Sequence, residues 1–277
     1  MFKSGEIDRI IDNALREDMP EGDITSENVV SQDSTSKAVF TGKEEGILAG
    51  IEVAEKVFKK IDPEIRIKKY FRDGQGIKKG EKLAVLQGSS ISLLKGERTA
   101  LNFLQRMSGI ATLTRRFVNG LKGSSTKLLD TRKTTPGLRI LEKYAVKTGG
   151  GVNHRFSLSD MVMLKDNHLR LVGDIRTAVE RVRANIRPGI KIEVETSNLK
   201  EVKEAISSGA DMVMLDNMSL NKMREVVEWV NGRVPLEVSG KVDLDNIKDI
   251  ALLGVDYVSV GSLTHSFKSL DISMGFF

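Results

Sequence analysis

The sequence predicts an α/β protein whose C-terminal half forms a (β/α) barrel. From about residue 125, short apolar segments alternate with longer segments of helical periodicity, which is the order expected of parallel strands joined by helices. Each strand candidate ends in polar or small residues, and the carboxyl ends of barrel strands all open on one face. A doubly wound sheet would instead gather its ligand at one switch point, so the strand ends favour the barrel. Residues 160–167 reappear in part at 211–217, which supports repeated strand-and-helix units.

The periodicity assigns the elements in chain order. In the N-terminal half we expect helices at 6–17 and 93–110, and short strands bounded by turn signals at 36–40, 46–49, 65–71 and 82–86. In the C-terminal half we expect strands at 127–129, 161–164, 191–194, 212–215, 235–238 and 257–260, and helices at 173–184, 199–207, 220–231 and 244–253. The chain should therefore form a smaller N-terminal α/β domain at 1–110 and a barrel domain at 111–265. We expect the C-terminal tail, 266–277, to pack back on the N-terminal domain.

The composition excludes several classes of protein. The 277 residues include no cysteine, so a disulfide framework and a thiolate metal site are both excluded. We expect a cytoplasmic protein with no membrane partner, because neither a signal peptide nor a membrane-spanning run is evident. The net charge is +5, but one Trp and three Tyr offer no aromatic platform beside the basic residues, so we expect no nucleic-acid partner. A cationic binding pocket explains the positive charge more specifically than a generally basic surface does.

Residues 130–168 concentrate cationic side chains and glycines. The segment holds two of the three histidines, a glycine triplet at 149–151 and Arg and Lys at irregular spacing, which indicates a backbone bent around a polyanion. The cationic candidates, which Arg139 could join, are Arg132, Lys133, His154, Arg155 and Lys165. Arginine offers a planar fork to a carboxylate or phosphate, and lysine offers a compact charge. Any one of these residues alone is more often a solvated loop residue, so the prediction depends on their conjunction.

Two further sets of polar residues follow strands. Glu195 and Asp216 suit sugar hydroxyls or a Mg²⁺ ion that keeps several waters, although they could instead cap the following helices. Ser239-Gly240 and Gly261-Ser262 can offer backbone N–H groups to a phosphate, as loops after the last strands of barrels do, although Ser239 could also be only a helix cap. The three sets together predict a ligand with a phosphate, a ribose-like diol and a further acidic group. The sequence lacks the Gly-x-Ser-x-Gly elbow, the P-loop and the dinucleotide fingerprint.

Motifs throughout the chain resemble those of quinolinate phosphoribosyltransferase, also called carboxylating nicotinate-nucleotide pyrophosphorylase. The most specific motifs lie at 130–137, 153–155 and 164–168, and others lie at 22–25, 97–102, 108–112, 193–195, 215–217 and 238–240. The similarity covers essentially the whole chain in consistent order. It implies an N-terminal α/β sandwich domain and an irregular, incomplete (β/α) barrel.

The resemblance also implies a pentosyltransferase reaction. Quinolinate and phosphoribosyl pyrophosphate, with Mg²⁺ as cofactor, give nicotinate mononucleotide, pyrophosphate and CO₂ in de novo NAD biosynthesis. The implied assembly is a homodimer, or a multiple of dimers, in which the N-terminal domain of one subunit covers the barrel mouth of its partner.

The resemblance assigns a role to each site residue. The two quinolinate carboxylates would be held by Arg132, His154, Arg155 and Lys165, with Arg98 reaching in from the partner subunit. Lys133 would meet the pyrophosphate, Glu195 and Asp216 the ribose hydroxyls and the metal, and Ser239, Gly240 and Gly261 the 5′-phosphate. The implied catalytic residues are Arg132, Lys133 and Lys165. The family usually has a second glycine after Ser-Gly, where this chain has Lys241.

Three alternatives stay open at this point. A phosphoribosyltransferase for nicotinate or another monoacid would need only one carboxylate clamp. A molybdate-transport-associated homologue would share the fold. The turn-rich segment 71–81 is also typical of carrier domains, in which Lys78 or Lys79 would bear a prosthetic group.

Overall fold

The computed structural model describes residues 4–277, which divide into two compact units. The first unit comprises the chain up to Arg115 together with Thr134–Gly150 and Leu263–Phe277. The second comprises Arg116–Lys133 and Gly151–Ser262. By this division residues 134–150 group with the N-terminal unit, whereas the sequence placed them in the barrel domain. None of the helices within 4–277 combines the length and the apolarity that crossing a bilayer requires.

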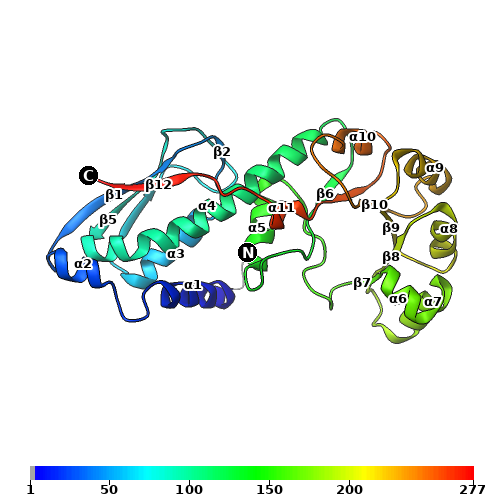
Figure 1. Cartoon of the computed structure of the whole chain (residues 1–277), viewed down its shortest axis with the longest axis horizontal. Coiled ribbons are helices and arrows are strands. Elements are labelled where there is room, and N and C mark those ends of the chain that lie inside the picture. The colour runs from blue at the N-terminus through cyan, green and yellow to red at the C-terminus, as the bar shows by residue number, and fades with distance from the viewer. Residues whose placement is uncertain (1–3) are drawn as a thin grey trace. The chain divides into compact units, whose positions relative to one another are not determined.

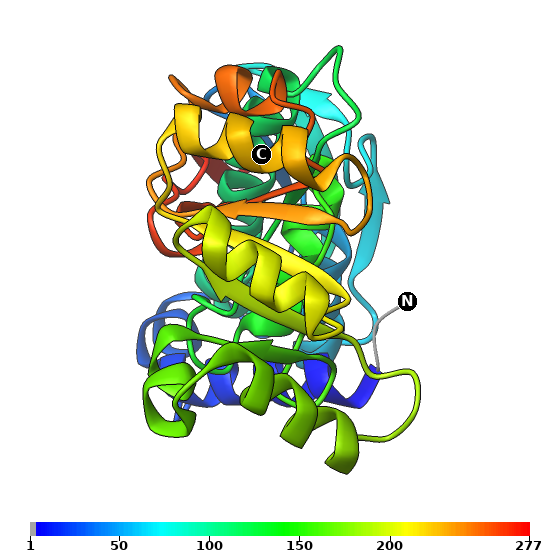
Figure 2. The same ribbon diagram turned by 90° about the vertical axis from the view of Figure 1, so that its right-hand side faces the viewer.

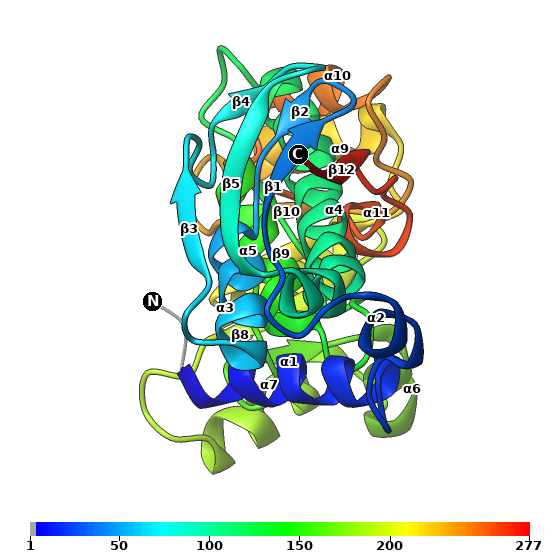
Figure 3. The same cartoon turned by 90° about the vertical axis from the view of Figure 1, so that its left-hand side faces the viewer.

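The first unit is built on a four-stranded antiparallel sheet in the order β12-β1-β5-β3 (Figures 1 and 3). Its elements are α1 (Ser4–Asp18), α2 (Ile24–Val29), β1 (Thr35–Gly42), β2 (Gly46–Ile47), α3 (Ile51–Ile61), β3 (Arg66–Lys69), β4 (Gly76–Ile77), β5 (Lys82–Ser89), α5 (Arg139–Gly149) and β12 (Ile272–Phe276). The long helix α4 (Ser90–Gly120) begins in this unit, and the short α11 (Ser262–His265) lies at its C-terminal boundary. The strand β12, which lies in the C-terminal tail, pairs antiparallel with β1.

Alternation along β1 decides which face of this sheet is buried. Ala38 and Phe40 point to the core and are at most 1% exposed, while their neighbours are more accessible. The Phe40 ring lies 6.1 Å from that of Phe58 on α3, which joins the sheet to the helix layer. Neither α3 nor α5 was predicted from the sequence.

The glycine triplet has a structural explanation. Gly149 ends α5, and Gly150 is its C-cap with φ of +102°, a conformation that favours glycine. A Cβ atom on Gly149 would lie 2.5 Å from the carbonyl oxygen of Ala111 on α4, so only glycine allows this close approach. These two glycines therefore end a helix and let it pack, which explains them without an anion, and the polyanion prediction depends on the other residues of the stretch.

The second unit is a six-stranded parallel sheet covered by helices (Figures 1 and 2). Its strands are β6 (Lys127–Leu129), β7 (Val162–Leu164), β8 (Ile192–Thr196), β9 (Met212–Asp216), β10 (Leu236–Ser239) and β11 (Tyr257–Ser259), and its helices are α6 (Asp166–Val172), α7 (Ile175–Asn185), α8 (Leu199–Ser207), α9 (Leu220–Val230) and α10 (Ile247–Ala251). The sheet order is β6-β11-β10-β9-β8-β7, so the first strand lies beside the last, as in a barrel. Among residues 4–277 no strand ladder joins β6 to β7, and the barrel stays open there. The predicted fold class is confirmed.

The two faces of this sheet differ in chemistry. One face is aliphatic, and Val194, Val213 and Val238 on it are fully buried. The other face, which lines the barrel interior, carries Glu193 and Glu195 on β8 and continues on β9 and β10. Because successive strand residues point to opposite faces, this polar face gathers side chains from several strands into one interior.

Candidate active site

A buried aspartate organises the cationic loop that follows β6. Asp130 is 0% exposed, and its two carboxylate oxygens accept hydrogen bonds from the His154 backbone N–H at 2.8 Å and from Asn153 Nδ2 at 2.5 Å. The loop 153–155 is thereby fixed to the carboxyl end of β6. Sequence reasoning gave Asp130 no role of its own.

Arg132 and Arg155 lie close enough to repel each other. The guanidinium of Arg155 donates to the carbonyl oxygen of Met161 at 2.9 Å. Burial, and after it the charge of Arg132, lower the pKa of Arg155. Two neighbouring guanidinium groups are favourable when a ligand with negative charges lies between them. This pair is therefore the clearest anion-binding feature of the second unit.

A lysine and a glutamate meet at the ends of β7 and β8. Lys165 directly follows β7, and its Nζ lies 3.1 Å from Glu195 Oε2, with the two side chains 45% and 15% exposed. The backbone N–H of Lys165 donates to His168 Nδ1 at 3.0 Å, which gives His168 a role at the start of α6. Both charged groups of the pair thus remain accessible to a ligand.

Three predicted ligand-binding residues lie on the same interior face. Ser239 pairs in register with Asp216, and Glu195 pairs with Met214, two residues before Asp216. None of the three caps the following helix, because the N-cap residues of α8, α9 and α10 are Asn198, Ser219 and Asn246. The helix-cap alternatives are therefore wrong, and the polar side chains are available at the barrel mouth.

The loop after β10 has room only for glycine at one position. Gly240 has a φ of +89°, and a Cβ atom there would lie 2.3 Å from Asn217 Oδ1. The next residue, Lys241, also has a positive φ, of +52°, which is uncommon for a side chain of this kind. Close backbone approach here is consistent with the predicted phosphate loop.

His154 faces two fully buried glutamates beneath the mouth. Its Nε2 lies 3.2 Å from Glu193 Oε2 on β8 and 3.1 Å from Glu237 Oε2 on β10, and its side chain is 8% exposed. Its Nδ1 accepts a hydrogen bond from the backbone N–H of Arg155 at 2.7 Å. The resemblance assigned His154 to a quinolinate carboxylate, and that assignment stays a prediction; the ligand atoms of His154, Glu193 and Glu237 also lie close enough together to hold a metal ion. The sequence offered one signal for the two glutamates, namely a charged residue within each of two apolar strands.

The cluster of His154, Glu193 and Glu237 holds two protons in either of two arrangements. Burial alone lowers the His154 pKa, but the two carboxylates more than offset it and raise the pKa to about 9. Burial, together with the charge of Glu237, raises the Glu193 pKa to about 7. An Nδ1 that accepts a hydrogen bond is unprotonated, so we favour a neutral ring with one protonated glutamate. An imidazolium beside two carboxylates has the same net charge of −1.

This cluster should make the folded protein less stable as the pH rises from about 7 to about 9.5. In either arrangement the folded cluster holds one proton more than the unfolded chain above pH 6.5, so its contribution is complete below that pH and is lost as the pH rises through the raised His154 pKa of about 9. The raised Glu193 pKa acts in the same direction, since its contribution is lost as the pH rises from 4.5 through about 7. Thermal unfolding should show a larger fall in Tm over this range for the wild type than for His154→Gln. Parallel pH profiles would contradict the assignment.

The remaining predicted residues lie as follows. Lys133 is exposed after β6, with its backbone N–H donating to Thr131 Oγ1 at 3.0 Å. Gly261 is half-buried two residues beyond β11. Arg98 is exposed on α4 and Arg139 is the first residue of α5, both in the first unit, whereas the other predicted site residues lie in the second.

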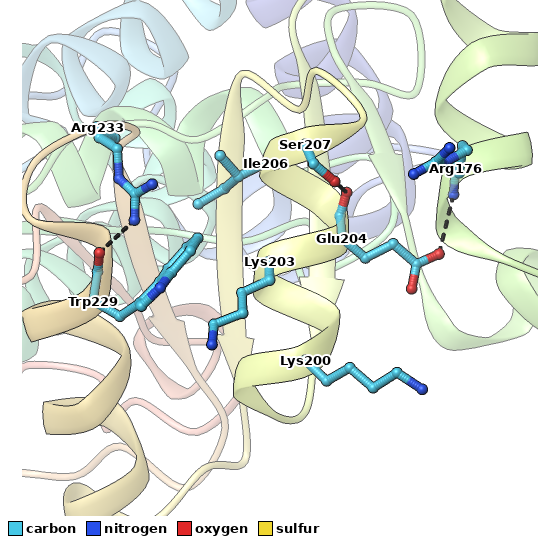
Figure 4. A pocket seen from close by; sticks show the side chains of 8 residues that line it. All are labelled: Arg176, Lys200, Lys203, Glu204, Ile206, Ser207, Trp229 and Arg233. Atoms are coloured by element: carbon cyan, nitrogen blue, oxygen red, sulfur yellow. Dashed lines mark hydrogen bonds between the residues drawn. The ribbon is translucent and has the colours of Figure 1, made fainter.

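A second basic surface lies between the outer helices of the second unit. This groove of about 630 Å³ is shown in Figure 4, and its lining includes Lys203 on α8 and Trp229 on α9. The Arg233 guanidinium lies 3.9 Å from the centre of the Trp229 ring and Lys203 Nζ lies 5.2 Å from it. Arg233 also donates to the Trp229 carbonyl oxygen at the end of α9. These cations cover a tryptophan and a helix end, so we place the candidate site at the strand ends.

Comparisons with known proteins agree on one family. The models of the N-terminal and C-terminal domains of quinolinate phosphoribosyl transferase match residues 23–108 and 110–275. A probable nicotinate-nucleotide pyrophosphorylase [carboxylating] of Bacillus subtilis is 41% identical over 97% of this chain and 93% of its own. A mitochondrial quinolinate phosphoribosyltransferase [decarboxylating] of Nicotiana tabacum is 40% identical over 97% of this chain and 82% of its own. The crystal structure of NadC from Streptococcus pyogenes superposes with a TM-score of 0.97 at 43% identity, covering 100% of this chain and 98% of the other.

Proposed function

Because the chain belongs to the quinolinate phosphoribosyltransferase family, we propose that it transfers the phosphoribosyl group of phosphoribosyl pyrophosphate to quinolinate with decarboxylation. The products are nicotinate mononucleotide, pyrophosphate and CO₂, as a step of NAD biosynthesis. The observation that carries this proposal is the Arg132 and Arg155 pair, whose repulsion a dicarboxylate between them would offset. The family's N-terminal domain includes residues 71–81, which favours this enzyme over a carrier module.

The dicarboxylate would lie against Arg132, His154, Arg155 and Lys165. Arginine can hold each carboxylate through two parallel hydrogen bonds, and the half-exposed Lys165 adds a third positive charge. The clamp would orient quinolinate so that its ring nitrogen faces the anomeric carbon of the sugar. Orientation and charge neutralisation account for most of the acceleration, and no dedicated general base is required. The ring nitrogen becomes cationic after transfer and stabilises the carbanion left by the departing CO₂.

The phosphoribosyl group would lie along the interior face of β8, β9 and β10. We assign its hydroxyls to Glu195 and Asp216, and its 5′-phosphate to Ser239, Gly240 and Gly261. Backbone N–H groups at Gly240 can approach a phosphate closely because no Cβ fits there. Lys133, exposed after β6, would neutralise the leaving pyrophosphate.

The carboxylates at the mouth fit a Mg²⁺ ion. Glu195 and Asp216 are both partly exposed, so they offer oxygen ligands beside water, which is the environment that Mg²⁺ prefers. When bound, the ion would neutralise charge on the pyrophosphate. We therefore assign Glu195 and Asp216 as its protein ligands, directly or through water.

The proposed enzyme is a cytoplasmic homodimer, or a multiple of dimers, with shared sites. The resemblance assigns Arg98 to the site of the partner subunit, and its exposed position on α4 is compatible with that role. The absence of cysteine fits a reducing compartment.

The proposed reaction is tested by offering quinolinate and nicotinate separately with phosphoribosyl pyrophosphate and Mg²⁺. We expect nicotinate mononucleotide from quinolinate, with one CO₂ released for each pyrophosphate. A monoacid should react poorly, because it leaves one guanidinium of the Arg132 and Arg155 pair without a partner. Turnover of nicotinate without any CO₂ release from quinolinate would support the monoacid alternative instead.

A further inference from the structure

The segments that carry Arg132 and Arg155 are connected by one buried carboxylate, that of Asp130. We propose that Asp130 is a positioning residue, which fixes the separation of the two guanidinium groups and thereby favours a dicarboxylate over a monoacid. The proposal rests on the proposed function, since it explains how the carboxylate clamp of that site keeps its shape.

The Asp130 side chain connects two segments that are distant in the sequence. Asp130 directly follows β6 and stands two residues before Arg132. Its carboxylate accepts hydrogen bonds from the His154 backbone N–H at 2.8 Å and from Asn153 Nδ2 at 2.5 Å. His154 stands immediately before Arg155. One short side chain therefore ties the backbone beside one arginine to the backbone beside the other.

The carboxylate extends a short backbone connection toward Arg155. The described pairing between β6 and this segment is the single parallel bridge of Leu129 and Val152. In it the Val152 N–H donates to the Leu128 carbonyl oxygen at 2.8 Å, and the Val152 carbonyl oxygen accepts from the Asp130 N–H at 3.2 Å. Beyond this bridge, the Asp130 carboxylate binds the next two residues of the segment. The side chain thus continues the connection at the point where the second arginine follows.

The arginine pair needs such a connection because its two charges repel each other. Burial, and after it the charge of Arg132, lower the pKa of Arg155. In the absence of a ligand this repulsion favours a wider separation of the two guanidinium groups and of the backbone that carries them. A clamp whose separation is already fixed loses less free energy on ordering when a dicarboxylate binds. A shift of about 1 Å in such a group is enough to lower catalysis considerably.

The burial of this carboxylate also favours a positioning role. Asp130 is fully buried, and burying a carboxylate is costly unless hydrogen bonds compensate for its lost hydration. Buried charged groups are often replaced by apolar residues of similar volume without loss of stability. An apolar residue would fill the space but would leave the His154 N–H without this acceptor. The hydrogen bonds to the second segment are therefore what the carboxylate adds to the site.

The first experiment compares two variants at Asp130. Asp130→Leu removes the acceptor and keeps similar volume, so we expect the KM for quinolinate to rise about tenfold, while the KM for phosphoribosyl pyrophosphate changes less than about twofold. Asp130→Asn keeps an oxygen acceptor for the His154 N–H and should recover most of the quinolinate affinity. An unchanged quinolinate KM in Asp130→Leu, or an equal loss in both variants, would overturn the proposal.

The matched control for these variants is Asp256→Leu. The carboxylate of Asp256 also accepts a backbone N–H, that of Leu236 at 2.8 Å, but Asp256 is exposed and precedes β11, at the amino end of the strand. Its loss removes the same kind of hydrogen bond away from the strand ends that form the mouth. Both KM values should therefore equal those of the wild type, and a raised quinolinate KM here would mean that the Asp130 effect is not specific.

The second experiment acts on the exposed Asn153, so it decides even if Asp130→Leu fails to fold. Calorimetry compares phthalate, a dicarboxylate that lacks the ring nitrogen, with benzoate, its monocarboxylate counterpart. Asn153→Ala should weaken phthalate binding about tenfold and benzoate binding less than about twofold, because one carboxylate does not depend on the separation of the two arginines. The exchange of Asp130→Asn with Asn153→Asp keeps the net charge and restores a carboxylate–amide pair in reversed order. It should bind phthalate within about threefold of the wild type.

The outcomes of this experiment separate the two proposals. If the wild type binds phthalate and Asn153→Ala binds it equally well, or loses phthalate and benzoate to the same extent, the positioning role of Asp130 is refuted while the proposed function stands. If the wild type itself does not bind phthalate, the dicarboxylate clamp is absent, and the proposed function fails together with the positioning role.

Discussion

Arg132→Ala should remove nearly all turnover of quinolinate and leave the fold intact. A hydrogen bond to a charged group contributes about 1.5–3 kcal/mol, so losing a two-bonded carboxylate clamp should lower kcat/KM about 10²–10⁴-fold. Arg132 lies in the loop after β6, outside the strand ladder, and its neighbour Arg155 is relieved of a repulsion when it is removed. The circular dichroism spectrum and the Tm should therefore stay close to those of the wild type.

The matched control for this variant is Arg170→Ala. The Arg170 side chain on α6 is 77% exposed and lies 3.5 Å from Asp166 one turn away, so its loss should leave kcat/KM unchanged. Normal activity in a correctly folded Arg132→Ala protein would show that the cationic stretch does not form the dicarboxylate clamp.

Mixing two inactive variants should restore activity. If Arg98 serves the site of a neighbouring subunit, Arg98→Ala and Arg132→Ala are each inactive, but a mixed dimer has one site with both arginines. Random pairing at equal amounts gives half mixed dimers with one intact site of two, so we expect about a quarter of the wild-type specific activity. The two variants should be produced together with different affinity tags; the doubly tagged dimers, which are all mixed and have one intact site of two, should then show about half of the wild-type specific activity.

The control for this experiment combines two variants of the second unit. Arg132→Ala with Lys165→Ala removes residues that lie in one unit, so mixed dimers should have no intact site if each clamp comes from a single chain. Recovery in this control, or inactive mixed dimers of Arg98→Ala and Arg132→Ala, would contradict the shared site. Inactivity of the separate variants is the starting condition and is measured first.

The barrel strands were the most predictable part of the fold. Strand 127–129 and helix 199–207 have the predicted bounds, and the other barrel strands differ by one or two residues at an end. These segments are rich in aliphatic residues and have clear boundaries, so local periodicity is sufficient to predict where each one begins and ends. Helix α5 was not predicted from the sequence, because two of its buried residues, Glu142 and Lys143, are charged. They interrupt the apolar periodicity by which an amphipathic helix is identified. Glu142 is acceptable there because Arg106 and the Thr135 N–H donate to its carboxylate.

The sequence by itself determined which cations and carboxylates follow the strands and therefore meet at one face of a barrel. It also carried the motifs of the family across the whole chain. Only the tertiary structure decided that His154 faces Glu193 and Glu237, because β8 and β10 flank β9 and turn these two side chains to the same interior. A two-residue period says which positions of a strand share a face, but not which strands are neighbours or which loop lies over them. The cationic stretch predicted from charge alone is thus divided by the fold into a pair of arginines at the mouth and a histidine beneath them.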